Sequence, residues 1–71
     1  MTAVALNADR LRIELARRGL HASDLARISR VSNATVCSAM KGRRVSSRTI
    51  RRIATALLAV EPLQGVEALL D

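Results

Sequence analysis

Glycine and proline, the residues that most often interrupt regular structure, are few in this chain of 71 residues. Their positions divide it into short segments, which we expect to form short helices. Gly19, Gly42, Pro62 and Gly65 each stand where a helix is expected to end or a turn to form. No stretch alternates convincingly between apolar and polar residues, so strand signals are missing. The length allows one small core. We therefore expect a single domain over residues 1–71, an all-α, compact bundle of about five short helices.

Capping residues locate the first two helices. Asn7 is a favourable N-cap for a helix from about residue 8 to residue 18, which Gly19 ends. A short second helix covers about residues 22–29. Its N-cap is His21 if the helix starts at Ala22, whereas Ser23 would be the better chemical cap for a later start.

The fourth helix has the most regular apolar face. It begins at Ser46 or Ser47 and places apolar residues at helical spacing. A break at Glu61–Pro62 separates it from a short last helix over residues 66–70. The inward stripe of the fourth helix is expected to contain Ile50, Ile53, Ala54 and Leu57.

The third helix has an unusual outer face. It starts after Ser32, a strong N-cap, and ends near Gly42. Its spacing turns Val36, Ala39 and Met40 inward. The opposite face has small or polar side chains and one cation, which permits close approach to a groove about 12 Å wide. These outward residues are Asn33, Ala34, Cys37, Ser38 and Lys41.

Basic residues are concentrated around this helix. The chain has a formal net charge of +6, and no acidic residue occurs between Asp24 and Glu61. Cations on one surface bind a phosphate backbone and release its counter-ions, while polar side chains that contact base edges provide sequence specificity. Nucleic acid is therefore the favoured partner. The eight basic residues of this stretch are Arg27, Arg30, Lys41, Arg43, Arg44, Arg48, Arg51 and Arg52.

The amino-acid composition narrows the kind of nucleic acid and the expected location of the protein. The chain has no aromatic residue on which single-stranded bases could stack, so we expect double-stranded DNA as the partner. The lone Cys37 cannot form an internal disulfide, which fits a reducing cytosol. The start of the chain does not read as a signal peptide, and no apolar run approaches the length of a membrane span. We expect a cytoplasmic, nucleoid-associated protein without a membrane segment.

Catalytic and metal-binding patterns find little support in the sequence. It shows no carboxylate cluster, no nucleophile–base pair and no phosphate-cradling glycine loop. One cysteine and one histidine do not provide the ligands of a metal site. We expect a non-enzyme with no cofactor, no metal and no small-molecule ligand.

The second and third helices carry a family resemblance. The spacing of Leu25, Ala26, Val31, Val36 and Ala39 is what a tight helix-turn-helix over about residues 22–41 requires. With this set the chain resembles the Cro/cI-type, XRE-like family of helix-turn-helix repressors, which have a lambda-repressor-like fold. The resemblance covers about residues 11–58. Its matching text is Gly19-Leu20, Asp24-Leu25-Ala26-Arg27, Val31-Ser32, Ala34-Thr35-Val36, Lys41-Gly42, Ser46, Ile53-Ala54 and Ala56-Leu57.

Other features qualify this resemblance. Residues 31–49 also look like the headpiece of LacI-type regulators, but the preceding helix and the lack of a hinge and sugar-binding domain favour the Cro/cI type. Arg30 stands where the family usually has a turn glycine with positive φ. His21-Ala22 stand where the family often has Ser or Thr followed by Gln, so the contact that this Gln often makes is in doubt.

The resemblance implies roles for individual residues. Asn33 and Ala34, with Cys37 and Ser38 one turn further on, correspond to base-reading positions, and Asn can pair bidentately with adenine. Thr35 is balanced between a phosphate contact and a local capping role. For Cys37 a small inert residue is favoured over a redox switch. The phosphate contacts implied are Ser23, Ser32, Thr35, Lys41, Arg43 and Arg44, whereas Arg10, Arg12, Arg17, Arg51 and Arg52 are expected to form a solvated face.

The leading functional prediction is a sequence-specific DNA-binding transcriptional regulator, a small Cro-like repressor of phage or mobile-element type. Such proteins commonly bind pseudo-palindromic operators as homodimers. The alternatives are an antitoxin-type module that binds a partner protein through its apolar C-terminal segment and represses its own operon, or non-specific architectural DNA binding. Residues 62–71 form a candidate dimerisation element, or else complete the core, and Ile13 and Ile28 would join whichever surface they make. The candidate dimer residues are Leu63, Val66, Leu69 and Leu70.

Overall fold

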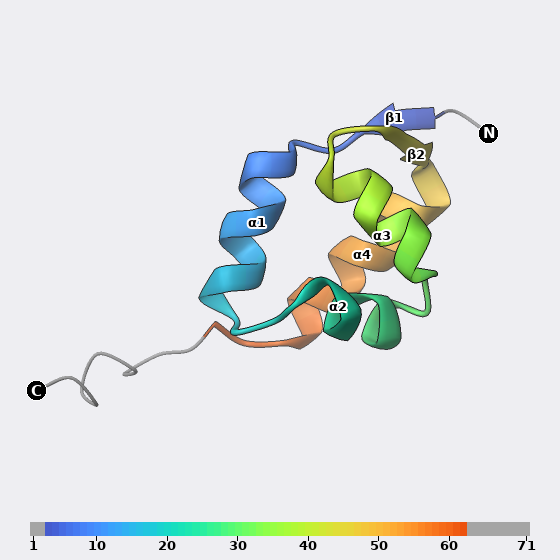
Figure 1. Ribbon diagram of the computed structural model, residues 1–71. Helices are drawn as coiled ribbons and strands as arrows, with labels where there is room; N and C mark the ends of the chain where they lie inside the picture. The colour runs from blue at the N-terminus through green and yellow to red at the C-terminus, as the bar shows by residue number, and fades with distance from the viewer. Residues whose placement is uncertain (1–2, 63–71) are drawn as a thin grey trace, which may run out of the picture.

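Four helices and two very short strands make up the described part of the chain. The computed structural model describes residues 3–62 (Figure 1). The fold is mostly helical, as expected, and the predicted fifth helix over residues 66–70 lies outside the described residues. The elements in chain order are β1 (Ala3–Ala5), α1 (Ala8–Arg17), α2 (Ala22–Ser29), α3 (Asn33–Met40), β2 (Arg44–Ser46) and α4 (Ser47–Ala59).

The first two helices begin at the residues that capping chemistry indicated. The Asn7 side-chain oxygen accepts a hydrogen bond from the Arg10 N–H at 3.0 Å, which confirms it as the cap of α1. His21 is the N-cap residue of α2, so the choice between His21 and Ser23 is settled in favour of His21. Its own N–H donates to the carboxylate of Asp24 at 2.9 Å.

The last two described helices share one capping arrangement. In α3 the Ser32 hydroxyl accepts the Thr35 N–H at 3.1 Å and donates to the Thr35 hydroxyl at 2.8 Å. In α4 Ser46 does the same with Thr49, at 3.1 and 2.9 Å. A Ser-x-x-Thr sequence therefore fixes the first turn of both helices.

The two strands contradict the expectation that the fold contains helices alone. Segments β1 and β2 pair antiparallel, with Val4 opposite Val45 and Ala5 opposite Arg44. Three residues are too few to show the alternation that marks a strand, and alanine has little preference for one. The pairing is a tertiary contact that joins the start of the chain to the segment between α3 and α4.

The core lies where the four helices meet. In Figure 1, α1 and α3 stand on opposite sides, α4 passes behind them and α2 crosses below. Leu25, Val36 and Ala39 are fully buried. Excluding a side chain as large as Leu25 or Val36 from water contributes about 1.5–3 kcal/mol, so these two supply much of the stability. The buried apolar residues are Leu11, Leu15, Leu25, Ala26, Val36, Ala39, Val45, Ile53 and Ala56.

The buried face of α4 differs from the predicted stripe. Ile53 is buried as expected, but Ala54 is exposed and Ala56 is buried in its place. The reason is that α4 packs against α2, which turns Ala56 inward. Ile13 and Ile28, which fitted no core position, are 49% and 39% exposed.

The helices of residues 3–62 are short. None of them is long and apolar enough to cross a membrane.

Candidate functional site

The turn between α2 and α3 has a left-handed residue at the position where a glycine would be usual. Arg30 has φ of 58°, and its N–H donates to the carbonyl of Ala26. The Val31 N–H donates to the same carbonyl at 3.1 Å. A non-glycine residue in this conformation costs on the order of 1 kcal/mol. The prediction of a positive φ at Arg30 is confirmed, and the turn is tight despite the missing glycine.

The two faces of α3 have opposite surroundings. Val36 and Ala39 are completely buried. Asn33, Ala34 and Cys37 are exposed on the other side of the helix, as the helical spacing predicted. Ser38 is half-buried, at the edge between the two faces. The helix therefore exposes an uncharged row of small and polar side chains, and its buried face fixes their position.

The basic residues that follow α3 are exposed but held in place by their backbone. The Lys41 N–H donates to the carbonyl of Cys37 at 3.1 Å, and the Arg43 N–H donates to that of Ser38 at 3.0 Å. Arg44 is fixed in turn because it belongs to β2. Gly42, between them, has φ of 75°, which allows the chain to turn. Three cations thus stand at one end of α3, which is roughly 12 Å long.

The hydroxyl residues near the helix starts differ in how free they are. Ser23 is exposed in the first turn of α2. Ser32 and Thr35 bond to each other, so the local capping role proposed for Thr35 is present in the structure. A helix N-terminus still leaves N–H groups without intrahelical acceptors, and these can receive an anion. The first turns of α2 and α3 offer such groups.

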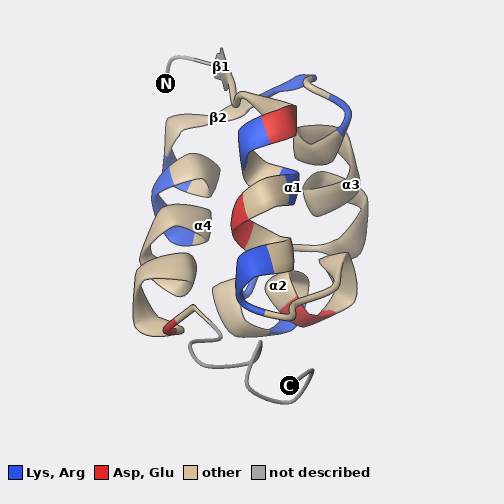
Figure 2. Ribbon diagram, turned by 90° about the vertical axis from the view of Figure 1, so that its left-hand side faces the viewer, with Lys and Arg blue, Asp and Glu red and all other residues tan. Residues whose placement is uncertain are grey.

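Charges divide the described chain into two parts. In Figure 2 the acidic positions, coloured red, lie on α1, near the start of α2 and after the end of α4, whereas blue basic positions run along α4 and the α3–β2 connection. All four arginines of residues 8–18 pair with Asp9 or Glu14. Arg27 pairs with Asp24 at 3.3 Å. Within residues 3–62 the cations that form no ion pair are Arg30, Lys41, Arg43, Arg44, Arg48, Arg51 and Arg52.

Two arginines have structural contacts that the sequence did not reveal. The Arg18 Nε donates to the carbonyls of Leu57 and Val60, both at 2.9 Å, and so joins the end of α1 to the end of α4. Arg12 donates to the carbonyl of Met40 at 2.8 Å, although its side chain stays 54% exposed, as expected for a solvated face. No local pattern could have indicated these bonds, because their partners lie 28 to 42 positions away in sequence.

Glu14 is the acidic centre of the α1 cluster. Its carboxylate accepts a hydrogen bond from Arg18 at 2.9 Å and lies 3.0 Å from Arg17 and 3.2 Å from Arg10. The hydrogen bond from Arg18, and then the nearby charges of Arg17 and Arg10, lower the pKa of Glu14 from its ordinary value of 4.5. One carboxylate is therefore shared by three arginines, which it holds close together at this end of the molecule.

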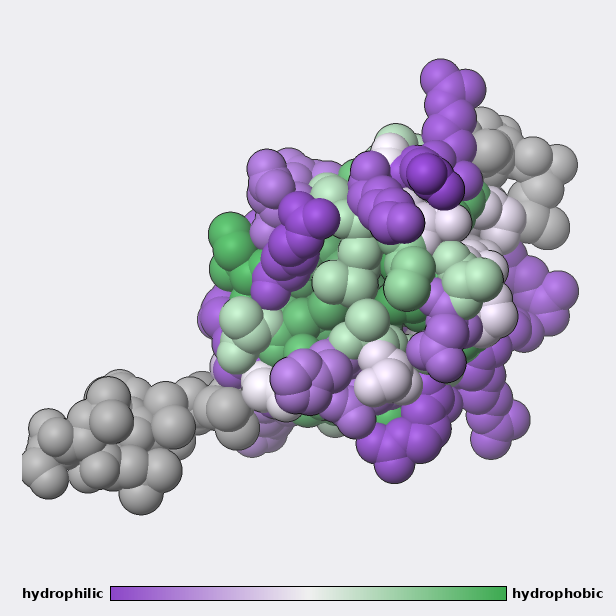
Figure 3. Space-filling model, in the orientation of Figure 1, coloured by the Kyte–Doolittle hydropathy of each residue, from purple (hydrophilic) through white to green (hydrophobic). Residues whose placement is uncertain are grey.

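Charged side chains border the face that carries α1 and α3. Figure 3 shows apolar and weakly polar residues over the middle of this face, with hydrophilic residues around them. A hollow lies there between α1, α2 and the end of α3. It is lined by Arg12, Leu15, Ala16, Gly19, Leu20, His21, Ala22 and Met40.

The candidate dimer residues Leu63, Val66, Leu69 and Leu70 lie outside the described residues.

Over residues 3–62, no three His, Cys, Asp or Glu side chains gather as a metal site would require. Comparison with known proteins finds no matching family model, no matching curated protein and no matching solved structure.

Proposed function

We propose that this protein is a sequence-specific regulator of transcription that binds double-stranded DNA, of the small Cro-like repressor type. In this proposal α2, the turn at residues 30–32 and α3 act as a helix-turn-helix, and α3 enters the major groove. One observation carries it: Val36 and Ala39 are fully buried while Asn33, Ala34 and Cys37 are exposed on the opposite face. A solvated helix would ordinarily present charged pairs there.

The outer residues of α3 suit the reading of base edges. Asn33 stands in the first turn, where an amide can donate to N7-type acceptors and accept from the amino group of adenine. Ala34 beside it suits contact with a thymine methyl group. Cys37 and Ser38 follow one turn later and reach neighbouring base edges or the backbone. All four side chains are short, so α3 can approach the floor of the groove.

The cations at the end of α3 suit contact with phosphates. Lys41, Arg43 and Arg44 are exposed and have no carboxylate partner in the described chain. Phosphate contacts of this kind fix the register of a protein on the duplex and supply affinity independent of sequence. Ser23, Ser32 and Thr35 would add contacts at the starts of α2 and α3. Two copies on half-sites about one helical turn apart would match a pseudo-palindromic operator.

Selection from a random duplex library tests the proposal. The protein is expected to enrich one motif, and to bind it far more tightly than scrambled duplex at moderate salt. Asn33→Ala should weaken binding to that motif by about 1–3 kcal/mol and reduce sequence specificity at one base pair. Arg17→Ala, a cation on α1 already paired with Glu14, is the matched control and should leave the motif and the affinity unchanged.

Two other results would replace this proposal. Equal affinity for selected and scrambled duplexes across a salt series would indicate architectural binding without sequence choice. Absence of duplex binding together with a tight complex with a neighbouring gene product would favour the antitoxin-type module.

A further inference from the structure

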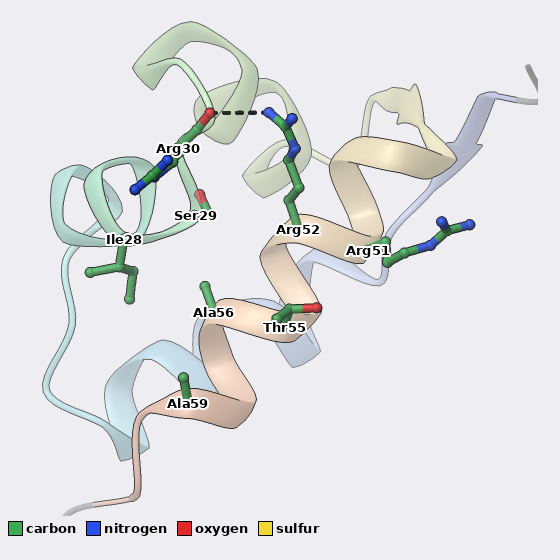
Figure 4. Close-up of a pocket in the computed structure, with 8 residues that line it drawn as sticks. All are labelled: Ile28, Ser29, Arg30, Arg51, Arg52, Thr55, Ala56 and Ala59. Atoms are coloured by element: carbon green, nitrogen blue, oxygen red, sulfur yellow. Dashed lines mark hydrogen bonds between the residues drawn. The ribbon is translucent and has the colours of Figure 1, made fainter.

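A second surface feature, away from the proposed reading face, is a hollow between α2 and α4. It has a volume of about 410 Å³ and is lined by the end of α2 and one side of α4 (Figure 4). Ile28, Ala56 and Ala59 make its floor apolar. Ile28 is 39% exposed there, although isoleucine is among the residues most often buried. This apolar floor is therefore open to a partner.

The rim of this hollow is basic. Its charged residues are Arg30, Arg51 and Arg52, and no acidic residue lines it. Figure 4 shows Arg52 reaching toward the carbonyl of Arg30, with which it forms a long hydrogen bond of 3.5 Å, while Arg51 extends outward from α4. A fitting occupant has apolar side chains for the floor and carboxylates for the rim.

The chain itself contains a segment with this chemistry. Residues 63–71 hold two carboxylates, Glu67 and Asp71, and no basic residue. They are a third of all the acidic residues in the chain, although the segment is less than a seventh of its length. The same segment contains the apolar residues Leu63, Val66, Leu69 and Leu70.

The route of the chain favours a second copy over the same molecule. Arg18 binds the carbonyls of Leu57 and Val60 and thereby holds the end of α4 against α1. The α1 side of α4 carries Ala54 and Leu57, whereas the hollow is lined by Thr55, Ala56 and Ala59 on the α2 side. Val60, the residue after α4, is therefore held at the end of α1 and does not line the hollow.

We infer that the α2–α4 hollow receives the acidic, apolar segment 63–71 of a second copy of this chain, so that two copies exchange these segments in a reciprocal dimer. Apolar side chains of the segment cover Ile28 and the alanines, and its carboxylates meet the arginines of the rim. The inference goes beyond DNA binding and is tested without DNA, so either proposal can fail while the other stands.

Sedimentation equilibrium of the full chain provides the first test. Wild type should form dimers, and Thr55→Glu, which places a carboxylate in the hollow, should weaken them by roughly tenfold or more. Ala54→Glu is the matched control, because it adds the same charge at an exposed neighbouring position on the other side of α4. A wild type that stays monomeric, or equal effects of the two substitutions, would overturn the inference.

Mixing two defective chains tests the exchange itself. Thr55→Glu has a damaged hollow and an intact segment, and the double variant Leu69→Ser, Leu70→Ser has the reverse. Each should dimerise poorly alone, whereas their mixture restores one of the two contacts and should form a heterodimer, detected by energy transfer between labelled copies. No heterodimer at any concentration, with circular dichroism showing both variants folded, would exclude an exchange between copies.

Discussion

Two arginine-rich regions of this small protein differ in what surrounds their charges. In α1 and at its C-cap, Arg18, four guanidinium groups all meet carboxylates of this helix; they belong to Arg10, Arg12, Arg17 and Arg18. From Arg30 to Arg52 no cation of the described chain forms an ion pair. The same residue type thus serves two purposes, which sequence composition alone does not separate. Two of the paired arginines, Arg12 and Arg18, also join α1 to other helices, whereas the unpaired cations are all exposed at the surface.

The location of each region supports this division. Arg18 and Arg12 reach backbone carbonyls of α4 and α3, so these two members of the paired set fasten α1 to the rest of the fold. Lys41, Arg43 and Arg44 adjoin the exposed residues of α3, which is where a duplex would bring its phosphates. Stability and DNA affinity should therefore respond to different arginines.

The largest expected effect is on folding and comes from the paired region. Arg18→Met keeps much of the side-chain volume but removes hydrogen bonds to Leu57, Val60 and Glu14. Because the Arg18 side chain is only 11% exposed, the loss should lower the free energy of unfolding by about 2–3 kcal/mol. Urea unfolding followed by circular dichroism measures it.

Arg43→Met is the matched substitution in the unpaired region. It should change the free energy of unfolding by no more than about 0.5 kcal/mol, because Arg43 is exposed. Equal destabilisation by the two variants would show that the two regions do not differ in their contribution to stability.

The next effect is on DNA binding and comes from the unpaired region. Arg43→Ala and Arg44→Ala should each reduce the slope of log binding constant against log salt by about 0.9, because each would remove one of the proposed phosphate contacts. Fluorescence anisotropy with the selected duplex at several salt concentrations gives the slope. Arg10→Ala, in the paired region, should leave it unchanged, and a similar change there would remove the distinction.

The smallest expected effect is on the pH dependence of stability. The pKa of Glu14 is lower in the folded chain than its ordinary value of 4.5, so ionised Glu14 stabilises the fold above that pH. This contribution is lost as the pH falls through the lowered pKa, when the carboxylate takes up a proton. Unfolding curves should show wild type losing stability in that acidic range relative to Glu14→Gln. Parallel pH profiles for the two chains would show that the arginine cluster does not depend on this charge.

Local sequence rules were sufficient for the helices but not for the contacts between them. Asn7, Ser32 and Ser46 cap helices where expected, because an N-cap acts within three residues. The buried and exposed faces of α3 followed from helical spacing for the same reason. Arg30 was recognisable as a left-handed turn residue, although only through a family resemblance.

The features that the sequence did not predict arise from contacts between residues that are distant in sequence. Segment β1 forms a strand only because β2 lies beside it, some forty residues later. Ala56 is buried in place of Ala54 because α2 packs on that side of α4. Arg12 and Arg18 looked like ordinary cations of a first helix until their carbonyl partners were known. The candidate site was therefore more predictable than the surface that supports it, since all its side chains except that of Ser23 come from α3 and the residues next to it.

The native thiol of Cys37 gives the most direct test of the claim that the outer face of α3 lies against duplex DNA. It is the single cysteine of the chain and is exposed beside the proposed base-reading residues. Its rate of alkylation by a maleimide can be compared with and without the selected duplex, and with that of a Cys37→Ser, Ile13→Cys variant whose thiol lies on α1. Strong protection of Cys37 and none at position 13 is the expected result. An unchanged rate at Cys37 under saturating duplex would contradict the account.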